Sequence, residues 1–177
     1  MNKQPIHIVW FKRDFRLVDN EALFHAHQSG VPLLLVCFFE PTVMNYDDSD
    51  VRHWRFVYES IQDLNKKLAP FNASLYFFHD EVKAVFSKLI LEFDVKTVFS
   101  HQEIGNKVTY DRDVEMKAFF DSNDIAWKEF QLHGVIRKLK SRQNWDQRWE
   151  QVMRDTPKLI KESDLKTIVL PADLYDS

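Results

Sequence analysis

Five short apolar runs recur along the chain, and each is rich in β-branched or aromatic residues. They cover residues 6–11, 33–39, 74–78, 96–100 and 126–130. The second run is apolar at every position, which is typical of a strand covered on both faces of a sheet. Because runs of this length and composition favour extended structure, they are the predicted strands.

Amphipathic helical patterns lie between these runs. The clearest spans residues 82–93, where apolar side chains recur at the i, i+3, i+4, i+7 spacing of one buried stripe. A second pattern spans residues 51–68 and ends shortly before Pro70. Further helices are predicted over residues 21–28, 108–120 and 145–153, the first of them capped by Asp19 or Asn20.

Predicted strands and helices therefore alternate, and each connection is long enough for a crossover helix. This order is typical of an α/β fold with a mostly parallel sheet, right-handed crossovers and helices on both faces, in three Rossmann-like layers. We expect one domain over residues 1–155. The periodicity weakens after Pro157, so residues 156–177 are predicted to begin a linker toward another domain.

Composition narrows the class of protein. The chain has 177 residues, is 45% hydrophobic and carries a net charge of −3, so no overall basic field would attract nucleic acid. The single cysteine, Cys37, lies within an apolar run, which predicts a buried thiol and a reducing, cytoplasmic compartment. No apolar run approaches the roughly 20 residues of a membrane span, so no membrane association is expected.

Several common sites are excluded by residue type and spacing. Only three glycines are present, so neither the dinucleotide-binding G-x-G-x-x-G turn nor a P-loop can be written. The histidines and the cysteine do not fall at zinc-ligand spacing, so no metal site is predicted. No arrangement of nucleophile, acid and base predicts a catalytic site.

The most informative segment is residues 9–20, which read VWFKRDFRLVDN. It places Lys12, Arg13 and Arg16 directly after the first predicted strand. From charge alone, a solvated loop with local ion pairs to Asp14 and Asp19 is the simpler interpretation. The order of the residues, however, closely resembles the opening signature of the DNA photolyase and cryptochrome family, with Phe15 in place of the usual leucine.

Two further segments resemble the same family in the same order. One begins at Arg55-Phe56 and continues through Glu59-Ser60 and Asp63-Leu64 to Leu68. The other runs from Asp111-Arg112-Asp113 to the turn at residues 133–137. The resemblance covers nearly the whole of residues 6–155.

This resemblance implies the N-terminal antenna domain of that family, with a five-stranded sheet of order 3-2-1-4-5. It implies a light-harvesting chromophore in this domain, and FAD and damaged DNA bound by a helical C-terminal domain. The intact protein would then be a deoxyribodipyrimidine photo-lyase, a carbon–carbon lyase acting in DNA repair, whereas this chain alone would be inactive. The alternatives are a cryptochrome photoreceptor and a nucleotide-binding or interaction domain without a chromophore.

The expected ligand site follows from the sheet order. Ligands in open α/β sheets bind beyond the carboxyl ends of the strands where the order reverses, here between the first and fourth strands. The candidate residues at this point and its rim are Phe11, Lys12, Arg13, Phe39, Glu40, Arg52, Arg55, His101, Gln102 and Glu103.

Roles for these residues follow from what a flat heterocycle requires. Phe11 and Phe39 either stack on the ring or belong to the core. Gln102 or Glu103 would bond ring N–H groups, and an arginine would meet a phosphate or carboxylate. The chromophore itself could be a deazaflavin, a reduced folate or FMN, although Val108-Thr109 departs from the pattern of the folate-binding branch.

A basic segment over residues 137–148 combines cations with Trp145, which is a composition seen in nucleic-acid interfaces. The spacing of Trp145, Trp149, Val152 and Met153 instead favours a helix that packs inward or against another domain. We expect its cations to lie on a solvated face.

Overall fold

A computed structural model describes residues 3–132, 135–137, 139 and 141–175. The strands are β1 (Pro5–Trp10), β2 (Leu33–Phe38), β3 (Leu75–Phe78), β4 (Asp94–His101) and β5 (Ala126–Phe130). The α-helices are α1 (Glu21–Gln28), α2 (Pro41–Met44), α3 (Val51–Leu68), α4 (Val82–Glu92), α5 (Lys107–Ser122), α6 (Trp145–Met153) and α7 (Ala172–Tyr175). Two short 3-10 turns are η1 (Ala69–Phe71) and η2 (Glu162–Asp164).

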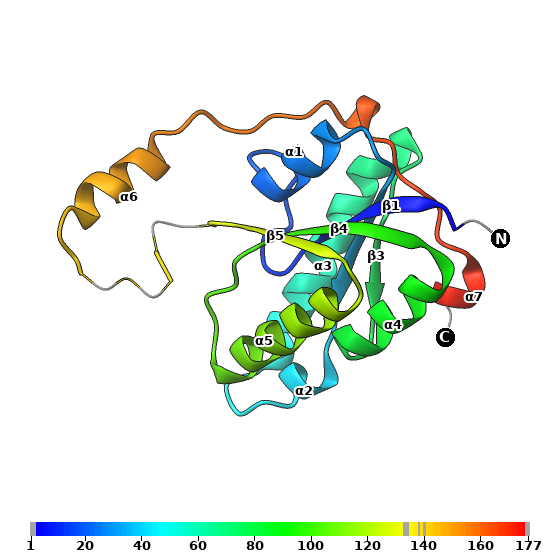
Figure 1. Cartoon of the computed structure of the whole chain (residues 1–177), viewed down its shortest axis with the longest axis horizontal. Helices are drawn as coiled ribbons and strands as arrows, with labels where there is room; N and C mark the ends of the chain where they lie inside the picture. Colours follow the sequence, from blue (N-terminus) through cyan, green and yellow to red (C-terminus); the bar gives the residue numbers. More distant parts are fainter. Residues whose placement is uncertain (1–2, 133–134, 138, 140, 176–177) are drawn as a thin grey trace.

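The strands form one parallel sheet of order β3-β2-β1-β4-β5, as predicted (Figure 1). The first two crossovers run from β1 toward one edge, and the next two return to β4 and β5 at the other. The order therefore reverses between β1 and β4, and the helices that follow these two strands, α1 and α5, cover opposite faces of the sheet.

A separate apolar cluster fills each face of the sheet. Alternate residues in and directly after β1 divide between them: Ile8 and Trp10 pack with α4 and α5, whereas Val9 and Phe11 pack with α1 and α3. This division confirms the three-layer arrangement. Cys37 is buried in the second cluster, and burial raises the pKa of its thiol.

The loop after β1 is held by a cap on α1. Of the two caps predicted from sequence, Asn20 is the one used: its Oδ1 accepts from Leu23 N at 2.9 Å. Its Nδ2 also donates to Asp14 Oδ2 at 3.0 Å. The helix start and the loop that carries the basic residues are thereby joined.

Helix α6 stands away from the sheet (Figure 1). Its large apolar side chains are 39–50% exposed, so the prediction that they pack inward is wrong; the residues are Trp145, Trp149, Val152 and Met153. Their packing against another domain stays a prediction.

The segment after α6 returns to the sheet and runs along it to α7 (Figure 1). Leu33 N donates to Lys166 O at 2.7 Å, and Ile168 N donates to Leu33 O at 2.9 Å. Leu165 and Leu170 are buried. Residues 156–177 were expected only to begin a linker; the described part, up to residue 175, also adds to both apolar clusters. A continuation into another domain stays a prediction.

Candidate functional site

The loops after β1 and β4 meet at the reversal of strand order, as expected. Together with Leu132 after β5 they enclose a small cavity lined by Lys12, Arg13, Asp14, His101, Gln102, Glu103, Ile104 and Leu132. Its volume is about 20 Å³, close to the space that one water molecule needs. Ligand sites usually measure about 300–1,000 Å³, so a ring system would have to lie at the mouth rather than inside.

Arg13 and Glu103 form the outer part of this crevice. Arg13 Nε donates to Glu103 Oε1 at 2.8 Å; the Arg13 side chain is 59% exposed and that of Glu103 only 5%. Gly105 permits this close packing, because a Cβ there would lie 2.4 Å from Thr109 Oγ1 and 3.3 Å from Glu103 Oε1.

Arg112, from the second turn of α5, occupies the centre of the site. It donates to Glu40, to Glu103 Oε2 at 2.5 Å and to Asp113 Oδ1 at 2.9 Å. Burial lowers the pKa of Arg112, but the three carboxylates outweigh it and raise the pKa above its ordinary value. Burial raises the pKa of Glu103, yet Arg112 and Arg13 together hold it below the ordinary value.

Lys12 lies deeper, with a side chain only 3% exposed. Its Nζ contacts both oxygens of Asp113 at 3.0 Å and sits over the rings of Trp10 and Trp127, 4.4 and 4.9 Å from their centroids. Burial lowers the pKa of Lys12, and the attraction of Asp113 offsets this only in part. The ammonium therefore depends on Asp113 and the aromatic faces for its stability.

Arg137 closes the group from the segment after β5. It donates to Glu129 Oε1 and Asp113 Oδ2, each at 3.3 Å, and to the backbone carbonyl of Glu103. Its side chain is 28% exposed, so the prediction that Arg137 lies on a solvated face is wrong. Lys138 and Lys140 of the same basic segment lie outside the described residues.

We call this group the switch-point network; its members are Lys12, Arg13, Glu40, Glu103, Arg112, Asp113, Glu129 and Arg137. It contains four basic and four acidic side chains, so its charges balance when all eight are ionised. Mutual pairing is the condition on which charged groups are stable in a buried site.

Beside the network, Asp14 and His101 form a buried pair. Asp14 Oδ2 lies 2.5 Å from His101 Nδ1. Burial opposes ionisation of Asp14, but its hydrogen bond with His101 and the backbone N–H groups keep its pKa below the ordinary value. The pair connects the loop after β1 with the end of β4 and so fixes the floor of the crevice.

The structure brings six of the ten predicted residues together: Lys12, Arg13, Glu40, His101, Gln102 and Glu103. Phe11 and Phe39 are 1% and 9% exposed and belong to the core cluster beneath α3. A stacking role for either ring would require it to leave that cluster, and it stays a prediction. Arg52 pairs with Asp50 at the start of α3, and Arg55 is exposed on the same helix.

The residues that sequence reasoning missed are the partners Arg112, Asp113, Glu129 and Arg137. The sequence did point to two of them, because Arg112 and Asp113 lie within the family-like segment that runs from Asp111 to residue 137. Their role was not visible, since it depends on which face of α5 turns toward the carboxyl ends of β1 and β2.

Glu40 gives the site a measurable dependence on pH. Burial raises its pKa to about 7, although Arg112 opposes the shift. Because the folded state holds this proton more tightly than the unfolded state, ionisation of Glu40 reduces stability as pH rises from its ordinary pKa to about 7. The unaltered chain therefore loses stability over this range, whereas Glu40→Gln does not. The difference in free energy of unfolding between the two should shift in favour of Glu40→Gln by on the order of 3 kcal/mol.

Urea unfolding at pH 5, 6, 7 and 8 measures this difference. Glu150→Gln, an exposed carboxylate on α6, is the matched control and should show little change across the series. If the difference in free energy of unfolding between Glu40→Gln and the unaltered chain does not change with pH, Glu40 does not have a raised pKa in the folded state.

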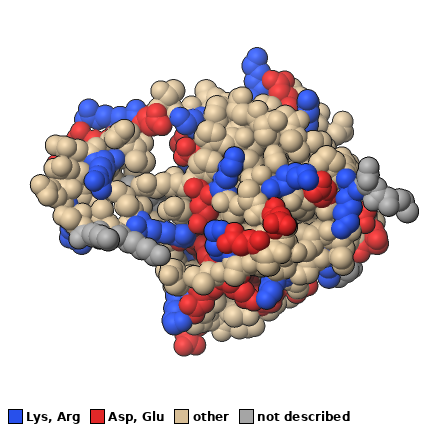
Figure 2. All heavy atoms as spheres, viewed as in Figure 1, with Lys and Arg blue, Asp and Glu red and all other residues tan. Residues whose placement is uncertain are grey.

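Figure 2 shows basic and acidic groups interspersed over the face in view. None of the helices among the described residues is long and apolar enough to cross a membrane. Within the same residues, no group of His, Cys, Asp and Glu has the geometry to hold a metal ion.

Comparisons with known proteins agree on one family. The family model described as DNA photolyase matches residues 7–170. Cryptochrome DASH, chloroplastic/mitochondrial, of Arabidopsis thaliana is 28% identical over 102 residues, which are 54% of this chain and 18% of that protein. Cryptochrome-2 of Gallus gallus is 30% identical over 86 residues, 49% of this chain and 15% of its own length. The chain thus spans less than a fifth of either relative.

Solved structures share the fold at low sequence identity. A photolyase from Sulfolobus tokodaii superposes with a TM-score of 0.76 at 19% identity, over 93% of this chain and 38% of that one. A cryptochrome from Synechocystis gives 0.74 at 16% identity, over 99% of this chain and 41% of that one. Likeness at this identity establishes the fold.

Proposed function

Because the chain belongs to the DNA photolyase family, we propose that it is the light-harvesting domain of a larger flavoprotein. The observation that carries this proposal is the convergence of Arg13, Gln102 and Glu103 at the switch point, where α/β sheets bind their ligands. The Sulfolobus tokodaii photolyase with a similar fold is described as holding two FAD molecules, with a novel light-harvesting cofactor implied. That description supports an antenna role for this fold.

In the proposed site, the chromophore lies at the mouth of the crevice. The bond from Arg13 to Glu103 uses Nε, and the largely exposed guanidinium can also meet a phosphate or carboxylate of the ligand. Ile104, 41% exposed, offers apolar surface beside it. When bound, the chromophore would supply absorption of light and transfer of excitation; the protein binds, orients and shields it.

For the whole protein we propose a deoxyribodipyrimidine photo-lyase, whose FAD and damaged DNA are bound by a helical C-terminal domain, acting in the cytoplasm. The cryptochrome alternative is favoured by the names of the curated relatives given above. Illumination of the full-length protein with dimer-containing DNA, followed by a count of remaining dimers, separates the two functions.

Chromophore binding by the chain tests the antenna role. A deazaflavin, a reduced folate and FMN would each be titrated and followed by fluorescence. We expect one of them to bind saturably, and Arg13→Ala to weaken that binding roughly tenfold, since a charge-assisted hydrogen bond is lost. Lys96→Ala is the matched control, because Lys96 lies near the amino end of β4, whereas the proposed site lies beyond the carboxyl ends of the strands.

Failure of all three ligands would overturn the antenna role and favour an interaction domain. Equal weakening by Lys96→Ala and Arg13→Ala would show that the ligand binds away from the switch point.

A further inference from the structure

Helix α6 lies in an excursion of the chain that begins and ends at the switch-point crevice. The chain leaves after Arg137, whose side chain donates to the backbone carbonyl of Glu103 in the loop after β4. It returns at Lys158, whose backbone N–H donates to Asp19 Oδ1 at 3.2 Å in the loop after β1. The Asp19 N–H in turn donates to the Lys158 carbonyl at 2.8 Å. Both ends are thus bonded to the two loops that form the crevice, and we call the described residues 141–157 between them the α6 arm.

The arm is bonded at its ends and not along its length. Among the residues that the structure describes, its hydrogen bonds and ion pairs join residues of the arm to one another or to Lys158. Figure 1 shows α6 on the side of the sheet toward which β5 points, beyond the carboxyl ends of the strands. Such a segment can move as a unit about its two ends, as lids over binding sites do.

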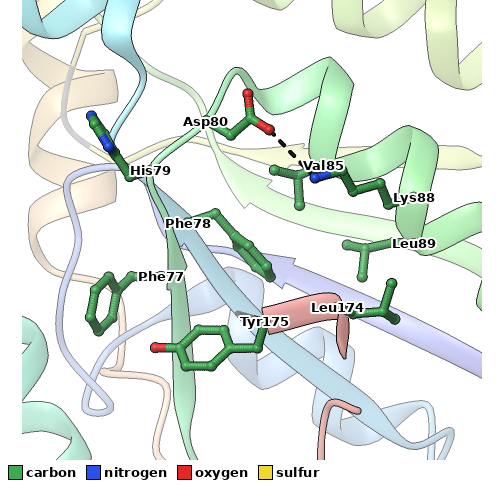
Figure 3. Close-up of a pocket in the computed structure, with 9 residues that line it drawn as sticks. All are labelled: Phe77, Phe78, His79, Asp80, Val85, Lys88, Leu89, Leu174 and Tyr175. Carbon is green, nitrogen blue, oxygen red and sulfur yellow. Dashed lines mark ion pairs between the residues drawn. The ribbon is translucent and has the colours of Figure 1, made fainter. Parts of the chain in front are cut away.

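The chain that follows the arm is held on the sheet. The backbone N–H of Leu170 donates to Tyr76 Oη at 3.0 Å. Figure 3 shows Tyr175 of α7 beside Phe78 of β3, and their ring centroids lie 5.9 Å apart at 84°. Because these contacts fix the segment after Lys158, we expect movement to be confined to the arm.

The arm carries the aromatic surface that the crevice lacks. Trp145 and Trp149 are 39% and 42% exposed, and their ring centroids lie 6.5 Å apart. Their spacing places them on one face of α6 together with Val152 and Met153. None of the described residues that line the crevice is Phe, Tyr or Trp, and Ile104 provides apolar surface at its mouth. An exposed apolar face of this kind usually marks a surface that becomes covered.

We propose that the α6 arm is a lid that closes over the mouth of the switch-point crevice. In the closed position, Trp145 and Trp149 lie over Ile104 and the exposed guanidinium of Arg13. Closure removes apolar surface from water and places a cation against an aromatic face. A flat ligand at the mouth is then covered by indole rings. The inference rests on the site of the proposed function, but it concerns the arm and not the identity of the chromophore.

A disulfide between two introduced cysteines tests closure without any ligand. Ile104→Cys places one thiol at the mouth and Val152→Cys places the other on the apolar face of α6. A disulfide forms only where the two Cα atoms approach within about 7 Å. The control pair is Leu91→Cys with Val152→Cys, because Leu91 is 75% exposed but lies just before β4 begins, at the amino ends of the strands. We expect the first pair to cross-link at least roughly tenfold faster under mild oxidation, and Cys37 to stay unreacted because it is buried.

Binding of FMN gives a second readout, because a stacked indole quenches flavin emission. Trp149→Ala should weaken FMN binding roughly fivefold, the usual effect of losing one aromatic contact. Phe71→Ala is the matched control: Phe71 is 38% exposed but lies in η1, beyond the far end of α3. Circular dichroism verifies that each variant is folded.

The outcomes separate the lid from the antenna role. If Ile104→Cys with Val152→Cys cross-links no faster than the control pair, the arm does not close and the lid is rejected, whichever chromophore binds. If it cross-links faster and no chromophore binds, the lid stands and the antenna role falls. FMN binding that Arg13→Ala weakens and Trp149→Ala leaves unchanged would reject the aromatic cover and leave the antenna role standing.

Discussion

Replacement of Asp113 by alanine is expected to lower the free energy of unfolding by about 3–5 kcal/mol, the usual cost of removing one partner of a buried ion pair. Asp113 is 7% exposed and accepts from Lys12 at 3.0 Å and from Arg112 at 2.9 Å. Without it, the Lys12 ammonium keeps, among the residues that the structure describes, only Glu129 at 3.9 Å and the faces of two tryptophans. Arg112 retains Glu40 and Glu103, so the loss falls mainly on Lys12.

Guanidinium-induced unfolding at neutral pH measures this cost. Lys12→Met is the matched control, because methionine fills similar apolar space beside the tryptophans and leaves Asp113 paired with Arg112 and Arg137. We expect Lys12→Met to cost less than Asp113→Ala, and the double variant to cost less than the sum of the two. An Asp113→Ala variant as stable as the unaltered chain would show that water already solvates Lys12.

The strands and most helices could be predicted because each carries its signal locally. Strand β2 is buried on both faces and is therefore apolar at every position. Helix α4 is buried on one face and therefore carries a single apolar stripe. The place of the proposed ligand site was predicted from the strand order, which the family resemblance supplied. The four-residue helix α2 was missed, because Pro41 and Thr42 begin a turn too short to show a period.

The contents of the switch point could not be predicted from sequence. Lys12 and Asp113 are 101 residues apart, and their contact depends on the rotation of α5 about its axis. The segment after β1 showed where cations gather. It did not show that carboxylates from the loops after β2 and β4, from β5 and from α5 pair with them. Phe11 is apolar at the end of a strand, and that pattern does not distinguish a ligand wall from a core residue.

The C-terminal segment was hidden for a different reason. Leu165 and Leu170 are buried, but extended chain with isolated apolar residues has neither the period of a helix nor that of a strand. Its contacts with Leu33 and Tyr76 arise only once the sheet has formed. A domain boundary placed after residue 155 therefore omits side chains that complete the core on both faces.

Leu170→Ala is accordingly expected to lower the free energy of unfolding by about 2–4 kcal/mol, the usual cost of a large cavity in a core. Leu170 is 5% exposed among the residues that α4 and α5 cover, and its backbone N–H donates to Tyr76 Oη at 3.0 Å. Leu159→Ala is a matched control of the same residue type in the same segment. Since Leu159 is 64% exposed, its loss should change stability by less than about 0.5 kcal/mol.

Comparing Leu170→Ala with Leu159→Ala shows whether the segment after α6 is packed on the sheet or is a free linker. Denaturant unfolding of both variants gives the two costs directly. If Leu170→Ala and Leu159→Ala are equally stable, the segment does not stay docked in solution and the domain ends near residue 155. If Leu170→Ala is destabilised, the segment belongs to the folding unit, because only a side chain that is buried in the native state leaves a cavity when it is shortened.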